Sequence, residues 1–123
     1  MSTLGHSIVF VSDMDRSVRF YRDVLGFALR FESPEWTEFD TGGTTLALHA
    51  TGRPPAEETP HPSSPPGRCQ LGLQVADIHE FHNRLTQHGV PCLAPPAVQD
   101  FGGTLAKYAD PDGLPFSVSE RPA

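Results

Sequence analysis

The stretch HSIVFVSDM, residues 6–14, decides the fold because a related stretch, QLGLQVADI, occurs at residues 70–78. In both copies apolar residues alternate along a predicted strand that ends at a valine. An aspartate then follows, Asp13 in the first copy and Asp77 in the second, at the position that caps the first turn of a helix. The separation of 64 residues therefore indicates an internal repeat of a strand followed by a helix.

The repeat continues beyond the two helices. Both helices show apolar residues at helical spacing and stop at a glycine, Gly26 in the first and Gly89 in the second. Three strand-like segments follow each helix, at 28–33, 35–40 and 44–50 in the first copy and at 90–96, 104–109 and 114–120 in the second. The turns before the last strands, TGG and DPDG, also match, at a separation of 70 residues. The sequence predicts an α+β fold of two βαβββ modules whose facing sheets form a cleft.

The module boundaries come from a proline-rich stretch. Six of the 13 prolines lie within residues 51–68, where they exclude both a helix and a regular ladder of backbone donors. We therefore expect one domain, 1–123, with module 1 at about 1–50, a connector at 51–68 and module 2 at about 69–123. The chain is long enough for one substantial core and too short for two independent domains.

Composition excludes several classes of partner. A net charge of −6 gives no electrostatic basis for binding nucleic acid or an anionic membrane. No apolar run approaches the roughly 20 residues that a membrane span needs. The N-terminal residues do not read as a signal peptide, and Cys69 and Cys92 do not form a CxxC pair, so we expect a cytoplasmic protein with free thiols.

Four segments together resemble the vicinal oxygen chelate superfamily, which includes glyoxalase I, extradiol dioxygenases, fosfomycin-resistance enzymes and bleomycin-resistance proteins. They are VSDMDRSVRFYRDVLGF (11–27), GGTTLAL (42–48), LQVADI (73–78) and DPDGLPFSVSE (110–120). The resemblance covers nearly the whole chain except the connector. It implies a glyoxalase/bleomycin-resistance-type fold with a cleft enclosed by curved mixed sheets, on which unrelated chemistries occur.

In metal-dependent members of that superfamily, the ligands come from the first and last strand of each module. The resemblance places His6, Ala47, Gln70 and Ser117 at those four positions, and the internal repeat gives the same correspondence. Members that bind a metal have an acidic residue, often glutamate, where this chain has Ala47 and Ser117. Without these carboxylate ligands we expect no cofactor. Because the same carboxylates act as general bases in the superfamily, we also assign no catalytic residue. The alternative is an unusual divalent-metal site of His6, His49 and Gln70.

Aromatic and neutral polar residues suit the predicted cleft better than a metal does. Strand alternation places Ala47 and His49 on the cleft side and puts Trp36 on the same face as Glu38. Phe101 precedes two glycines in a loop, and Tyr108 lies on the next strand. These aromatic side chains either bind a ligand or fill a sheet core or a dimer interface. The predicted ligand-binding set is His6, Trp36, Ala47, His49, Gln70, Phe101, Tyr108 and Ser117.

Other polar residues have local explanations. Glu120 has the opposite alternation to Ser117, so we expect its side chain to point away from the cleft. His82 lies on the second helix and is expected to be solvated. Asp110 and Asp112 are typical of a turn.

Three functions are consistent with these residues. The first is a metal-free protein that binds or sequesters an aromatic or cationic small molecule. The second is a glyoxalase-type lyase or isomerase, or a dioxygenase, with an atypical metal site around His6. The third is a scaffold or regulatory module without a ligand. We expect a homodimer, because the predicted sheets leave surface and edges exposed. Small proteins with this resemblance also usually form dimers.

Overall fold

The computed structural model describes residues 4–54, 66 and 69–120. The chain divides into two compact units, Met1–Ala56 and Glu57–Ala123, and each is described by itself. Most of the predicted connector, residues 55–65 and 67–68, lies outside the described residues.

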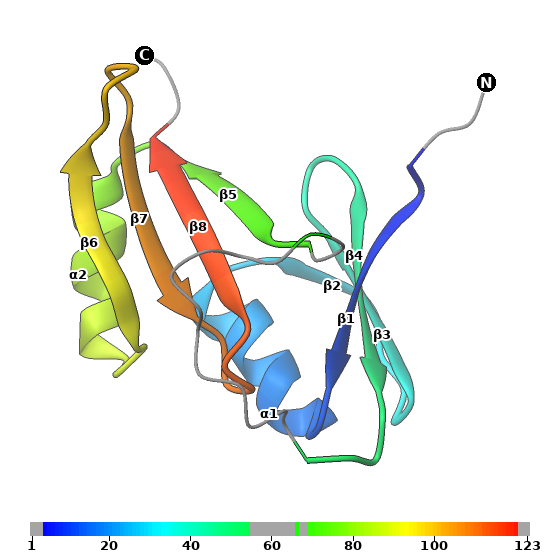
Figure 1. Cartoon of the computed structure of the whole chain (residues 1–123). Coiled ribbons are helices and arrows are strands. Elements are labelled where there is room, and N and C mark those ends of the chain that lie inside the picture. The colour runs from blue at the N-terminus through cyan, green and yellow to red at the C-terminus, as the bar shows by residue number, and fades with distance from the viewer. Residues whose placement is uncertain (1–3, 55–65, 67–68, 121–123) are drawn as a thin grey trace. The chain divides into compact units, whose positions relative to one another are not determined.

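Unit 1 is a mixed four-stranded sheet with one helical segment (Figure 1). Its elements are β1 (His6–Val11), α1 (Met14–Arg19), η1 (Phe20–Val24), β2 (Ala28–Phe31), β3 (Trp36–Asp40) and β4 (Thr45–Ala50). The strand order is β1-β4-β3-β2, with β1 parallel to β4 and the other pairs antiparallel.

Unit 2 repeats this topology (Figure 1). Its elements are β5 (Leu71–Val75), α2 (Ile78–Gln87), β6 (Cys92–Val98), β7 (Thr104–Ala109) and β8 (Pro115–Glu120). The strand order is β5-β8-β7-β6, and β5 runs parallel to β8. The predicted α+β class and the two βαβββ modules are therefore confirmed.

The two aspartates cap the helices as the sequence predicts. Asp13 Oδ1 accepts a hydrogen bond from the backbone N–H of Arg16 at 3.1 Å. Asp77 Oδ1 accepts from the backbone N–H groups of His79 and Glu80, each at 3.1 Å. Such contacts satisfy backbone donors that have no partner within the helix.

The first helix differs from the expectation in its second half. Residues Phe20–Val24 form a π-helical turn, in which the N–H of Leu25 bonds to the carbonyl of Phe20 at 3.0 Å. The wider turn accompanies burial of the consecutive residues Phe20 and Tyr21. Apolar spacing alone gave no sign of this change, because it assumed a continuous α-helix.

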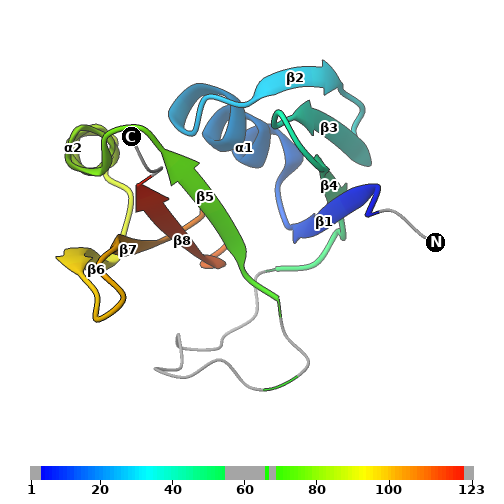
Figure 2. The same cartoon turned by 90° about the horizontal axis from the view of Figure 1, so that it is seen from above.

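In unit 1, α1 packs against one face of the sheet, as Figure 2 shows. Leu46 and Leu48 face this core, as strand alternation predicts, and Leu48 has no exposed surface. The other large apolar side chains that are fully buried here are those of Val11, Val18, Tyr21 and Phe39.

In unit 2, polar contacts accompany the apolar core beneath α2. His82 lies 2.9 Å, at Nδ1, from the hydroxyl of buried Tyr108, so the expectation that His82 is solvated was wrong. Glu120 Oε2 accepts a hydrogen bond from the backbone N–H of Ile78 at 3.0 Å. The last residue of β8 therefore joins Asp77 in capping α2.

The remaining local expectations concern turns, thiols and membrane spans. Asp110 Oδ1 accepts from the backbone N–H groups of Asp112 and Leu114, which confirms its role in the turn. Cys69 and Cys92 are exposed free cysteines. Within the part of the chain that the structure describes, no helix is long and apolar enough to cross a membrane.

We predict that Leu48→Ala lowers the free energy of unfolding by about 2–5 kcal/mol, because it leaves a cavity beneath α1. Urea unfolding followed by far-UV circular dichroism measures the change. Leu4→Ala is the control, since Leu4 is 75% exposed, and should change stability by no more than about 0.5 kcal/mol. Equal effects of the two substitutions would contradict the position of the core.

Candidate functional site

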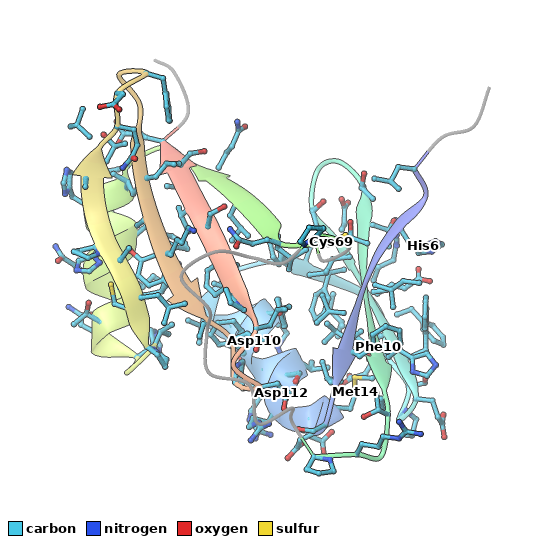
Figure 3. The ribbon with its side chains drawn as sticks, viewed as in Figure 1. His6, Phe10, Met14, Cys69, Asp110 and Asp112 are labelled. Atoms are coloured by element: carbon cyan, nitrogen blue, oxygen red, sulfur yellow. The ribbon has the colours of Figure 1, made fainter. Side chains whose placement is uncertain are left out.

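The candidate site is the face of the unit 1 sheet that α1 does not cover, called the open face here. Along β1, Val9 and Val11 are buried, whereas the alternate side chains of His6, Ile8 and Phe10 are exposed. Figure 3 shows His6 and Phe10 on the side of β1 away from α1. The strand register places Thr45, Ala47 and His49 of β4 beside these three residues, and Glu38 and Trp36 of β3 beside Ala47 and His49.

Four ring side chains form a continuous cluster on the open face. The ring centroids of Trp36 and His6 are 5.9 Å apart, and those of Trp36 and His49 are also 5.9 Å apart. Phe10 continues the cluster, at 5.7 Å from His49. All three contacts are edge-to-face, the arrangement that aromatic quadrupoles favour. The indole therefore lies in contact with both histidine rings.

Glu38 connects this cluster to a set of polar groups. Its Oε2 accepts a 2.8 Å hydrogen bond from Trp36 Nε1 and lies 3.7 Å from His6 Nε2. Its Oε1 lies 3.6 Å from Arg30 Nη2, and the same nitrogen donates a hydrogen bond to the hydroxyl of Thr45. The Trp36 hydrogen bond, with smaller contributions from the charges of Arg30 and His6, holds the pKa of Glu38 below its ordinary value. The carboxylate is therefore ionised at neutral pH.

Three of the predicted ligand-binding residues, His6, Trp36 and His49, are brought together by the structure. Ala47 lies on the same face, but it has no exposed surface because its neighbours cover it. Its small side chain therefore leaves room for the larger side chains that lie over it.

The other four predicted residues lie in unit 2. Gln70 is exposed just before β5, and Ser117 lies on β8, paired with Gly72 and Lys107 of the neighbouring strands. Phe101 is exposed in the β6–β7 turn, where its ring covers Gly103 so closely that an added Cβ would lie 2.4 Å from a ring carbon. These residues therefore belong to a different unit from the ring cluster.

Tyr108 differs from its expected place. Its side chain is fully buried between Phe116 and α2, on the covered face of the unit 2 sheet. Burial raises the pKa of Tyr108 to about 12, so its hydroxyl stays protonated beside His82. The expectation of Tyr108 on an open aromatic wall is corrected, because alternation along β7 points this side chain into the core.

The open face brings together too few donors for a complete metal site. Ala47 has no donor atom, and on the open face, as far as the structure describes the chain, only two metal-binding side chains, those of His6 and Glu38, approach each other, at 3.7 Å. Among the described residues, no group of three or more His, Cys, Asp or Glu side chains could hold a metal ion. A divalent metal needs at least three converging donors in sites of this kind.

The sequence interpretation placed Glu38 on the face of Trp36 without including it in the ligand-binding set, and it missed Arg30. The structure adds that the hairpin pairs Glu38 with Ala47. Arg30 lies on β2, and its guanidinium contacts Glu38 and Thr45 on this face.

A family model also matches nearly the whole chain. The Glyoxalase/Bleomycin resistance protein/Dioxygenase superfamily model matches residues 3–118. The chain belongs to this superfamily.

Relatives within the Glyoxalase/Bleomycin resistance protein/Dioxygenase superfamily have different functions. A bleomycin resistance protein of Klebsiella pneumoniae is 29% identical and aligns with 82% of this chain and 79% of its own length. A phenazine antibiotic resistance protein of Enterobacter agglomerans is 28% identical, with 86% and 82% aligned. A metallothiol transferase of Staphylococcus saprophyticus is 24% identical, with 96% and 76% aligned.

A solved structure supports the superfamily fold. The superfamily member from Sphaerobacter thermophilus matches with a TM-score of 0.76 at 26% identity, over 98% of each chain. The relatives include both resistance proteins and a transferase, so membership of the superfamily does not by itself fix the chemistry.

We predict that Glu38→Gln destabilises the protein at neutral pH and has a smaller effect in acid. Because the pKa of Glu38 is lowered on folding, its stabilisation is fully present above the ordinary glutamate value of 4.5 and is lost as the pH falls through the lowered pKa. Urea unfolding of both proteins across this pH range tests the prediction. Glu32→Gln, at an exposed position, should show no such trend, and a pH-independent difference for Glu38→Gln would contradict it.

Proposed function

We propose that this protein binds, and thereby sequesters, a small aromatic or cationic molecule at the open face without covalent chemistry. The observation that supports this most is the ring cluster of Trp36, His6, His49 and Phe10 around an ionised Glu38. Aromatic side chains with a few placed polar groups are typical of small-molecule sites.

The exposure of apolar side chains supports the same proposal. Ile8 and Phe10 are 49% and 65% exposed, although each belongs to a strand whose other side is buried in the core. Exposed apolar residues that lie together on one face are typical of surfaces that bind a ligand or a partner. A flat aromatic molecule resting on them would remove apolar surface from water and contact the Trp36 ring.

The names of two relatives support a role in resistance to small molecules. The names of two relatives state resistance to bleomycin and to phenazine antibiotics, and we extend that class of function to this chain as part of the proposal. A cytoplasmic location would suit a protein that sequesters a molecule after it has entered the cell.

We include a homodimer in the proposal. β1 and β2 are the edge strands of the unit 1 sheet, and β1 has exposed apolar side chains at that edge. Exposed edges of this kind favour pairing between chains.

A metal-dependent lyase or transferase is the second candidate. One observation favours it: an imidazole and a carboxylate, those of His6 and Glu38, lie side by side on the open face. The metallothiol transferase relative belongs to that class by its name.

We expect bleomycin or phenazine to change the fluorescence of Trp36, the only tryptophan of the chain, in a saturable manner. Phe10→Ala should weaken the binding about 2- to 10-fold, because it removes one ring from the cluster. Leu93→Ala, which removes an exposed apolar side chain from unit 2, is the matched control and should have no effect. Failure of both compounds to bind, or equal affinities in the two variants, would contradict the proposal.

Metal content separates the two candidates. We expect that protein produced in medium supplemented with Mn, Fe, Co, Ni and Zn contains no more metal than its His6→Ala variant, as measured by inductively coupled plasma mass spectrometry. Near-stoichiometric metal that disappears in His6→Ala would reject metal-free binding and favour the metal-dependent enzyme.

A further inference from the structure

Arg30 lies at an irregularity in β2, and its guanidinium group extends over the open face. Leu29 pairs with Phe39 and Phe31 pairs with Glu38, so no residue of β3 lies between the two positions, whereas one residue lies between them along β2. Arg30 is the additional residue. A bulge of this kind redirects side chains that a regular strand would point elsewhere. Here it allows both Arg30 and Phe31 to lie on the side of the sheet where Glu38 lies.

Arg30 is held in place by only one of its nitrogens. Nη2 donates to the Thr45 hydroxyl and lies 3.6 Å from Glu38 Oε1. Among the described residues, neither Nη1 nor Nε of Arg30 has a hydrogen bond or an ion pair. The side chain is 48% exposed. Because a guanidinium has five N–H donors in a rigid plane, most of this group remains available to a ligand.

Glu38 is less available than Arg30. Its side chain is 25% exposed, and three side chains, those of Trp36, Arg30 and His6, already lie around its two oxygens. The more accessible charge on this part of the face is therefore the guanidinium, and the carboxylate beneath holds it in position.

We infer that Arg30 binds the carboxylate of a planar aromatic acid whose ring lies on the apolar and aromatic side chains of the open face. The guanidinium forms a two-pronged contact that matches the planar geometry of a carboxylate. Glu38 contacts both the Arg30 guanidinium and the Trp36 indole. A ligand whose carboxylate binds Arg30 can therefore place its aromatic ring against Trp36. This inference rests on the proposed function and narrows its aromatic or cationic ligand to an aromatic anion.

The test uses three ligands that share one ring system and differ in charge: naphthoate, naphthalenemethanol and naphthylmethylamine. Isothermal titration calorimetry of the full chain should show the tightest binding for naphthoate. Arg30→Gln should weaken naphthoate binding about 5- to 10-fold, to the level of the neutral alcohol, because the charge-assisted hydrogen bonds are lost. The same variant should improve binding of the amine, since Glu38 then lacks the neighbouring cation.

Two further variants make the result specific. Arg30→Lys keeps the charge without the planar fork and should bind naphthoate with intermediate affinity. Arg22→Gln removes the same charge from η1, where Arg22 pairs with Asp23, and should leave naphthoate binding unchanged. Urea unfolding of each variant confirms that the fold is retained.

The outcomes separate this inference from the proposed function. If the probes bind and Phe10→Ala weakens them, but Arg30→Gln does not affect naphthoate, the role of Arg30 is rejected and the proposed function stands. Tighter binding of the amine than of naphthoate by the unaltered protein also rejects the inference and favours a cationic ligand. If the probes, bleomycin and phenazine all fail to bind, both proposals are rejected.

Discussion

The arrangement of the candidate site depends on the register of the parallel pair β1 and β4. In this register His6 lies beside Thr45, Ile8 beside Ala47 and Phe10 beside His49. Successive side chains of a strand point to opposite faces, so a shift of one residue would move the apolar set from the core to solvent. The buried partners Val9, Val11, Leu46 and Leu48 therefore fix the register through the free energy of their burial beneath α1. The packing of the covered face therefore determines which side chains lie on the open face.

Much of the fold was predictable because it depends on local patterns and on an internal repeat. Strand alternation and the aspartate caps identified the elements to within a few residues, and the repeat related the two units. The same alternation placed Trp36 with Glu38 and Ala47 with His49. Features that depend on distant segments were not predictable in this way. Glu120 reaches the start of α2 from the far end of β8, and Arg30 of β2 reaches Thr45 of β4 across the intervening strand β3.

The error at Tyr108 has a different origin. Its aromatic character suggested a pocket wall, but its neighbours Leu105 and Lys107 lie on the alternate face, and Tyr108 joins Phe116 in the core. A polar partner, His82, satisfies the hydroxyl there. Residue type alone therefore gave the wrong face, whereas strict alternation along β7 would have given the right one.

The hydrogen bond between Glu120 and Ile78 has a consequence for how the protein is made. Unit 1 has all its strands once residue 50 has left the ribosome, and its helix cap comes from the adjacent Asp13. In unit 2, α2 emerges about forty residues before the carboxylate of Glu120 that bonds to its first turn. The two units share a topology, but during synthesis the helix cap of the first comes from an adjacent residue, whereas the cap of the second is completed only after its last strand has emerged.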